Sequence, residues 1–265
     1  MAVLSCTEIA DYRRHGFHFP VPVLSAAEAA AARTAIEAFE AGCKAGRMSA
    51  GQRYKLHLVL PWLYDLVRHP RILEAVSGIV GPDVLVWNST FFIKEARDPS
   101  FVGWHQDMAY WGLEPPEVVT AWIAFTASTV ENGAMRIIPG SFEPQAHRDT
   151  FAALNMLSRG QELAVAVDAR DAVDVVMAAG EAALFDARLV HGSEPNRSDD
   201  RRIGLAIRYI APHVRQRRDP GVAMRSQSAV AVLGCGEDRF GHYALAPRPR
   251  SERDPEALAL HARNT

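Results

Sequence analysis

The residues most suited to metal chemistry are His105 and Asp107, two positions apart in the segment WHQD. In an extended strand, residues two apart project to the same face, so the imidazole and the carboxylate can reach one ion. A third ligand must come from elsewhere in the chain, and His191, in the segment LVHGS, is the best candidate. Two imidazoles and one carboxylate leave the opposite side of a metal open, as in non-haem iron(II) oxygenases.

An arginine pair follows the second histidine of this set. After His191 the chain has a turn signal and then a strand that opens with Arg201 and Arg202. A returning strand would carry one of these guanidinium groups back toward the metal. A guanidinium binds a carboxylate well because its planar fork forms two parallel, charge-assisted hydrogen bonds. An H-x-D pair alone is a weak signal, but the pair with this segment indicates a metal beside a carboxylate-binding site.

These segments together resemble the phytanoyl-CoA dioxygenase family of iron(II)- and 2-oxoglutarate-dependent enzymes, which includes many bacterial hydroxylases of secondary metabolism. The resemblance extends from about residue 12 to about residue 209. It is strongest in WHQD at 104–107, ENGAMRIIPGSF at 131–142 and VHGSEPNRSDDRR at 190–202. It implies a cupin-like double-stranded β-helix, or jelly-roll, with iron(II) as the metal and with 2-oxoglutarate and O2 as co-substrates.

The resemblance also implies roles for single residues. His105, Asp107 and His191 match the iron ligands, which makes them the catalytic and metal-binding residues. Arg202, eleven residues after His191, matches the arginine that binds the far carboxylate of 2-oxoglutarate, and Arg201 is the neighbour that could be confused with it. Three further positions match residues that contact the co-substrate, namely Ser193, Trp122 and Asn88. Trp122 can also be read as a core aromatic residue, and Ser193 as the cap of a turn.

The substrate pocket is expected at the mouth of the barrel. Three of its predicted residues, Met108, Tyr110 and Trp111, follow the H-x-D pair. Phe92 lies on the preceding strand, and Lys55 lies in a polar segment at 47–59 that is interpreted as a loop. Lys94 and His57 are weaker candidates in the same two places. The segment 212–228, with Arg215, Arg217, Arg218 and Arg225, is a candidate lid that meets an anionic substrate. Each of these residues has an alternative reading as a packed or solvated side chain.

The resemblance implies hydroxylation of an unactivated C–H bond of a small metabolite, with succinate and CO2 as co-products. Asp107 completes the set of three ligands, so halogenation, which uses a halide in place of the carboxylate, is disfavoured. The same metal site can instead serve desaturation, cyclisation or epimerisation. Two other classes stay open: a catalytically silent, ligand-binding member of the fold, and a metal enzyme that does not use 2-oxoglutarate.

Helices are expected in the first 80 residues. Ser25 and Glu28 have capping-box spacing, in which the serine accepts from the third helical N–H and the glutamate reaches back. They predict a helix over 28 to about 41. A second helical region is expected from 61 to about 78, and Pro70 should split or kink it, because proline disfavours helix at the residue before it.

From residue 84 onward the sequence pattern is typical of β-strands. Short segments rich in β-branched and aromatic residues alternate with turn signals, which is typical of a sandwich or a barrel. The predicted strands are 84–95, 118–127, 134–138, 163–167, 173–177, 181–185 and 203–210. No linker separates helices from strands, so a single domain is expected, with a helical part at about 1–80, a jelly-roll core at about 84–210 and a C-terminal lid and tail at about 211–265.

Composition indicates the cellular compartment and the kind of partner that this chain is expected to have. The 265-residue chain has a net charge of −2, which gives no reason to expect nucleic acid or a membrane as a partner. Its three cysteines are widely spaced and form no C-x-x-C pair, so a reducing cytoplasm is the expected compartment. No secretory signal and no membrane-spanning run are predicted. The expected partner is a small-molecule substrate, and the oligomeric state cannot be read from the sequence.

Overall fold

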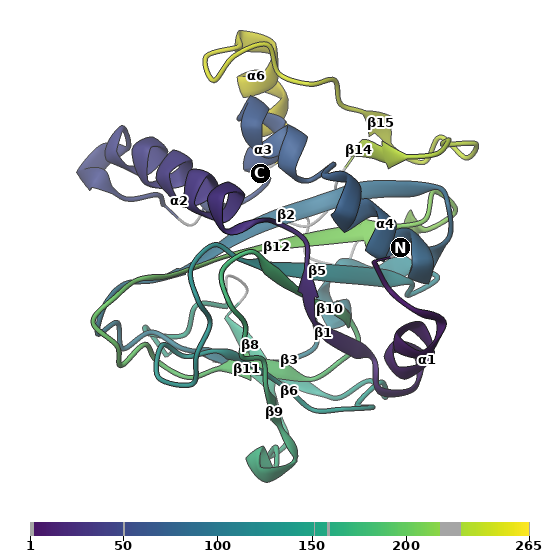
Figure 1. Ribbon diagram of the computed structural model, residues 1–265. Helices are drawn as coiled ribbons and strands as arrows, with labels where there is room; N and C mark the ends of the chain where they lie inside the picture. Colours follow the sequence, from purple (N-terminus) through teal and green to yellow (C-terminus); the bar gives the residue numbers. More distant parts are fainter. Residues whose placement is uncertain (1–2, 50, 151, 158–159, 218–228, 265) are drawn as a thin grey trace.

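Two mainly antiparallel sheets face each other and form the predicted double-stranded β-helix (Figure 1). The structure is a computed structural model that describes residues 3–264 except 50, 151, 158–159 and 218–228. Within these residues the larger sheet has seven strands, in the order β1-β10-β5-β12-β2-β14-β15. Their bounds, in the same order, are Phe17–Pro22, Glu181–Asp186, Val118–Ala124, Arg202–Ile210, Val84–Lys94, Val230–Cys235 and Ala244–Leu245.

The smaller sheet lies opposite the middle of the larger one. Its order is β3-β11-β6-β9, with bounds Val102–His105, His191–Ser193, Met135–Ile137 and Val173–Asp174. The described chain also has two short two-stranded sheets: β4 (Leu113–Glu114) with β13 (Arg215–Gln216), and β7 (His147–Asp149) with β8 (Gln161–Leu163). The smaller sheet therefore brings together segments from residue 102 to residue 193.

Most of the helices cover the outer face of the larger sheet, away from the smaller one (Figure 1). The α-helices are α1 (Cys6–His15), α2 (Ala26–Ala41), α3 (Pro61–Leu66), α4 (Pro70–Val80), α5 (Met108–Trp111) and α6 (Pro255–Arg263). Short 3-10 turns lie at η1 (Lys44–Gly46), η2 (Gly51–Arg53), η3 (Leu56–Leu58) and η4 (Ala169–Asp171). No helix in the described part of the chain is both long and apolar enough to cross a bilayer.

Local sequence explains where the predicted helices begin and end. The Ser25 side chain accepts from the Glu28 N–H at 3.2 Å, and the Glu28 carboxylate accepts from the Ser25 N–H at 2.7 Å, so the predicted capping box is confirmed. Pro70 separates α3 from α4 and becomes the first residue of α4, as expected for a residue without an N–H.

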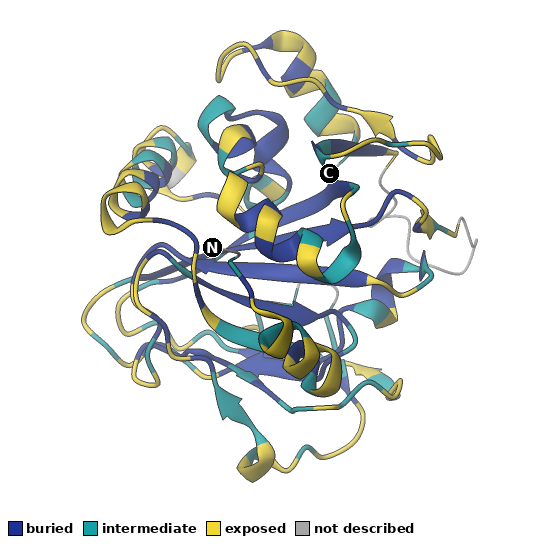
Figure 2. Ribbon diagram, turned by 45° about the vertical axis from the view of Figure 1, so that its right-hand side comes forward, coloured by how far each residue is buried: buried dark blue, intermediate teal, exposed yellow. Residues whose placement is uncertain are grey.

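The core divides into layers because strand residues alternate between two faces. On β2, Phe91 and Ile93 belong to the large hydrophobic cluster under the helices, whereas Phe92 packs with the cluster between the two sheets. Figure 2 shows the strands of the larger sheet buried between the helices, whose outer faces are exposed, and the smaller sheet. The face that carries Phe92 is the one that positions the site.

Several predicted elements have other bounds in the structure. The strand expected at 163–167 is β8 at 161–163, and that expected at 173–177 is β9, which ends at Asp174. Other elements were not predicted, among them α5, α6, β1, β11 and β14. Strands β1 and β14 are held by pairing with β10 and β2, which are distant in sequence. Of the predicted lid, Arg215–Gln216 forms β13, while 218–228, with Arg218 and Arg225, lies outside the described residues.

Candidate metal centre

His105, Asp107 and His191 come together in the structure. One ligand atom from each lies within 4.8 Å of the others, and all three residues are buried. His105 is the last residue of β3 and His191 the first of β11, and the two pair directly across these antiparallel strands. Their ring centroids are 4.1 Å apart. Strand pairing thus brings two histidines that are 86 positions apart in the sequence to one point.

The expected strand geometry of the H-x-D pair is wrong for Asp107. Strand β3 ends at His105, and Asp107 has helical dihedral angles (φ −58°, ψ −39°) at the start of α5. Gln106 explains the change of direction, because its side chain is fixed on the other side of the chain. Its amide donates to the carbonyls of Ser141, Glu143 and Arg188 at 2.7–3.1 Å, and its oxygen accepts from the Gln145 N–H at 2.8 Å. This anchor turns the carboxylate toward the imidazoles.

Both imidazoles are oriented by backbone carbonyl groups. Nδ1 of His105 lies 2.9 Å from the Gly103 carbonyl, and Nδ1 of His191 lies 2.9 Å from the Leu189 carbonyl. In the neutral tautomer that donates through Nδ1, the lone pair on Nε2 is free for a metal. Burial, together with the His105 ring, lowers the pKa of His191 to about 3. His191 is therefore neutral at physiological pH, which is the form that binds a metal.

The carboxylate of Asp107 is ionised. Burial alone would raise its pKa, but the Arg208 guanidinium and the two imidazoles lower it overall. Oδ1 lies 3.6 Å from Nε2 of His105, and Oδ2 lies 3.5 Å from Nη2 of Arg208. Oδ2 has no hydrogen-bond partner within the described chain. A buried anion beside two imidazole nitrogens fits a divalent cation, which would satisfy all three groups.

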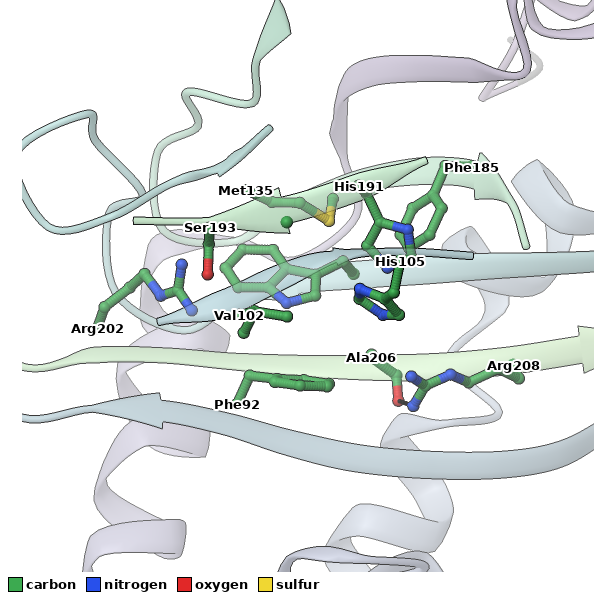
Figure 3. Close-up of a pocket in the computed structure, with 12 residues that line it drawn as sticks. Phe92, Val102, His105, Met135, Phe185, His191, Ser193, Arg202, Ala206 and Arg208 are labelled. Carbon is green, nitrogen blue, oxygen red and sulfur yellow. Dashed lines mark hydrogen bonds between the residues drawn. The ribbon is translucent and has the colours of Figure 1, made fainter. Parts of the chain in front are cut away.

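A pocket extends from these ligands between the two sheets (Figure 3). Six of the residues predicted from the sequence line it: His105, His191, Ser193, Arg202, Trp122 and Phe92. Arg208, which was not predicted, lines the same pocket. In Figure 3 the two arginines enter from opposite ends, with the imidazoles nearer to the Arg208 end. The pocket thus connects the metal ligands with a buried guanidinium group at each end.

Arg202 forms one end of the pocket. Its side chain is buried, and Nη1 donates to the Gly133 carbonyl. Its Cζ lies 5.4 Å from the Trp122 ring centroid, and its Nε has no partner in the described structure. Burial lowers the pKa of Arg202 to about 10, so the guanidinium stays charged at neutral pH. A buried cation with an unused donor is suited to bind a carboxylate.

Lys94 also lies at this end, although sequence reasoning placed it only among the weaker substrate candidates. It stands directly opposite Arg202 in the pairing of β2 with β12. Its Nζ donates to Ser193 Oγ at 2.8 Å and to the Glu194 carbonyl. Burial and the charge of Arg202 lower the pKa of Lys94 to about 6. The strand register, which the sequence does not give, is what places Lys94 beside Arg202 and Ser193.

The structure separates Arg202 from Arg201. Arg201, the residue before β12, points toward α2. It pairs there with Glu40 at 2.6 Å, Glu95 at 2.9 Å and Glu37 at 3.3 Å. Arg201 therefore fixes the start of β12 from outside, whereas Arg202 enters the pocket.

The other predicted residues are not among those that line the pocket. Asn88 is buried opposite Arg208 on the neighbouring strand, and Trp111 packs on the Arg208 guanidinium at 5.4 Å. Tyr110 donates to the Gln161 carbonyl at 3.2 Å, and Met108 is half-buried in the cluster around Trp111. Lys55 is buried at the edge of β2, where its backbone N–H donates to the Ser89 carbonyl. Burial lowers the pKa of Lys55 to about 7.

Known proteins resemble this chain in sequence. A family model described as phytanoyl-CoA dioxygenase matches residues 12–204. A probable alpha-ketoglutarate-dependent hypophosphite dioxygenase from Stutzerimonas stutzeri is 28% identical over 209 residues, which is 77% of this chain and 66% of that protein. L-proline trans-4-hydroxylase from Streptomyces griseoviridis is 28% identical over 163 residues, 54% of this chain and 61% of that protein. The matches thus span slightly less than two thirds of these two relatives.

Solved structures match over nearly the whole chain. ThoJ, described as a non-heme monooxygenase, superposes with a TM-score of 0.80 and 33% identity, covering 97% of this chain and 94% of ThoJ. CytC3 with Fe(II) and alpha-ketoglutarate superposes with a TM-score of 0.67 and 25% identity, covering 96% of each chain. This chain therefore shares its fold with CytC3, a protein whose structure contains Fe(II) and alpha-ketoglutarate.

Proposed function

We propose that this chain, which belongs to the phytanoyl-CoA dioxygenase family, is an iron(II)- and 2-oxoglutarate-dependent oxygenase that hydroxylates a C–H bond of a small metabolite. One observation carries the proposal: a buried His-Asp-His cluster opens onto a pocket that ends at the buried Arg202. The cluster supplies donors for iron, and the guanidinium supplies the partner for a carboxylate held away from the metal.

The protein's part in this reaction is to bind and to orient. His105, Asp107 and His191 would hold iron(II), which with bound 2-oxoglutarate activates O2 to oxidise a C–H bond, with succinate and CO2 as co-products. Arg202, Lys94 and Ser193 converge at the far end, where they would bind the distal carboxylate of 2-oxoglutarate. Trp122 lies against the Arg202 guanidinium and forms a wall of the pocket.

Enclosure between the two sheets supports the same function. The sides of the pocket are mostly apolar, with Phe92, Val102, Met135 and Phe185 among them. Such walls keep bulk water from the reacting centre and strengthen the charged contacts at both ends. The relative described as L-proline trans-4-hydroxylase supports hydroxylation in particular. Desaturation, cyclisation and epimerisation need the same metal site and remain the alternatives.

The proposal is tested with purified protein, iron(II) and 2-oxoglutarate under anaerobic conditions. We expect a weak visible absorption that requires both components, and succinate release once O2 is admitted. Loss of both signals in Asp107→Ala is the matched control. Metal binding without either signal in the wild-type protein would instead identify a silent, ligand-binding member of the family, and mass analysis of the product separates hydroxylation from its alternatives.

A further inference from the structure

The second buried arginine of the pocket, Arg208, contacts Asp107 but has no ligand assigned to it in the function proposed above. It lies six residues after Arg202 on β12, on the same face of the sheet, and only 6% of its side chain is exposed. We propose that Arg208 forms a second carboxylate-binding site, at the metal end of the pocket, and that the substrate carries this carboxylate. The inference rests on the proposed oxygenase function and names the substrate class for it.

The pairing of three strands gives the pocket two polar ends. Lys94 and Arg202 face each other at one end of the β2–β12 pair. At the other end Arg208 pairs with Asn88 on β2 and with Thr120 on β5, so the three side chains form a row across the sheet. Between these rows, on the same face, the residues are mainly apolar or lack a side chain: Phe92, Gly204, Ala206 and Trp122.

The polar groups of the Arg208 row are not satisfied by the protein. Within the described chain, Nε of Arg208, Oδ1 of Asn88 and Oγ1 of Thr120 are buried without a hydrogen-bond partner. Nη1 of Arg208 makes one long bond, 3.4 Å, to the carbonyl of Ala206, and Nη2 lies 3.5 Å from Asp107. Unsatisfied buried polar groups are costly and rare in native proteins, so a cluster of them indicates a ligand.

The guanidinium is fixed between two aromatic rings. Its Cζ lies 5.4 Å from the Trp111 ring centroid and 5.9 Å from that of Phe92. Stacking of this kind orients the planar fork while leaving the N–H groups at its edge free to donate. The orientation suits a ligand that accepts two parallel hydrogen bonds, and a carboxylate is such a ligand.

Charge also favours an anionic substrate. Iron(II) and the 2-oxoglutarate dianion would bring equal and opposite charges into the pocket. Two lining guanidinium groups, Arg202 and Arg208, then face one protein carboxylate, Asp107. At least one positive charge remains, because Lys94, protonated beside bound 2-oxoglutarate, would add to it. One carboxylate on the substrate would reduce this excess in a region where an unpaired charge is costly.

Position argues for the substrate over the co-substrate as the source of this carboxylate. Six residues of strand place the two arginine Cα atoms about 20 Å apart. The far carboxylate of 2-oxoglutarate is already provided with donors by Arg202, Lys94 and Ser193. Arg208 enters from the opposite end, near the imidazoles (Figure 3). This is the position expected of a group that recognises the substrate, because the substrate must lie close to the metal.

The test uses acetate as a minimal carboxylate and Ni(II) as an inert substitute for iron. Protein loaded with Ni(II) and saturated with 2-oxoglutarate is titrated with sodium acetate, and the midpoint of thermal unfolding is recorded. The control titration uses acetamide in sodium chloride of equal ionic strength. We expect stabilisation by acetate only, and in Arg208→Gln an apparent acetate Kd that is raised about tenfold or more. Arg208→Lys, which keeps the charge, should retain part of the effect and controls for loss of the fold.

Four outcomes would overturn the proposal. Equal acetate stabilisation in wild type and Arg208→Gln, or none in the wild type, would exclude a carboxylate site at Arg208. A loss of 2-oxoglutarate affinity in Arg208→Gln as large as in Arg202→Gln would make the co-substrate the occupant. A loss of nickel binding would reduce Arg208 to a positioning residue for Asp107. None of these readouts requires turnover. Failure of the oxygenase function itself would be recognised separately, because the protein with iron(II) would then show no absorption that depends on 2-oxoglutarate.

Discussion

Asp107 Oδ2 and Arg208 Nη2 lie 3.5 Å apart at the metal end of the pocket, both on buried side chains. The contact joins a residue just after β3 to one near the end of β12, and so links the two sheets at the metal centre. It also keeps Asp107 charged, because the guanidinium opposes the effect of burial on the carboxyl pKa. Neither residue can be changed without leaving the other buried and poorly paired.

Replacement of Asp107 should therefore affect both metal binding and stability. Asp107→Ala removes the only carboxylate of the described metal cluster and isolates the Arg208 charge. We expect loss of Ni(II) binding by calorimetry, and a decrease in the free energy of unfolding of about 3 kcal/mol in chemical denaturation, which is typical of a broken buried ion pair. Asp174→Ala, which breaks the more exposed pair with Arg136, is the control and should leave nickel binding intact. Nickel binding retained by Asp107→Ala would remove Asp107 from the ligand set.

The two neighbouring arginines should give opposite phenotypes. Arg202→Gln is expected to raise the Kd of 2-oxoglutarate about 10- to 100-fold in the nickel-loaded protein, because a charged, buried hydrogen-bonding partner is lost. Arg201→Gln should lower the thermal midpoint, since it breaks the pairs with Glu37, Glu40 and Glu95, but it should change the Kd little. Calorimetry and thermal unfolding of both variants check this pair of results. A larger affinity loss in Arg201→Gln would mean that the roles are exchanged.

Gly204 is expected to tolerate no side chain. A Cβ at this position would lie 2.0 Å from the Trp122 ring, which is rigid and must move as a whole. Gly204→Ala should therefore decrease stability by about 1–3 kcal/mol, as overpacking does, and should weaken 2-oxoglutarate binding because Trp122 lies against Arg202. Gly42→Ala is the control, since its Cβ would meet only the Phe39 carbonyl at 3.4 Å. Equal stability of the two variants by denaturant titration would show that the ring can be displaced at little cost.

The binding of 2-oxoglutarate should depend on pH through Lys94. Its pKa is about 6 because burial and Arg202 oppose the ammonium charge. A carboxylate bound beside it favours the ammonium form and raises this pKa, so binding at neutral pH takes up a proton. The affinity should accordingly fall as the pH rises from about 6 toward the higher pKa of the complex.

Calorimetry of the nickel-loaded protein in buffers of different ionisation enthalpy measures this proton uptake directly. Lys94→Met should abolish the uptake and flatten the pH dependence, while Lys55→Met, at the edge of β2 and outside the pocket lining, should preserve both. Proton uptake of the same size in Lys94→Met would assign it to another group.

Much of the site could be predicted from residue types and spacing. Family resemblance and the run from His191 to Arg202 indicated the ligand set and the carboxylate partner, and the structure brings His105, Asp107 and His191 together in one buried cluster. Helices with strong local signals, such as the one capped by Ser25 and Glu28, were also predicted, because a capping box is complete within four residues. These features share one property: the residues that define each of them are close in sequence, or belong to a segment with a recognisable pattern.

Tertiary structure decided the features that depend on strand register. Arg208 lines the pocket, and Lys94 stands beside Arg202 at its end, because β12 pairs with β2 and β5 at particular residues. No local pattern fixes which residues of distant strands face each other. The same cause explains the missed strands β1 and β14, which pair with distant partners. Asp107 leaves the strand because Gln106 is anchored to three carbonyls from later parts of the chain. The sequence by itself thus determined which chemical groups the site would use, whereas long-range pairing and side-chain anchoring decided how they are arranged and which further charges join them.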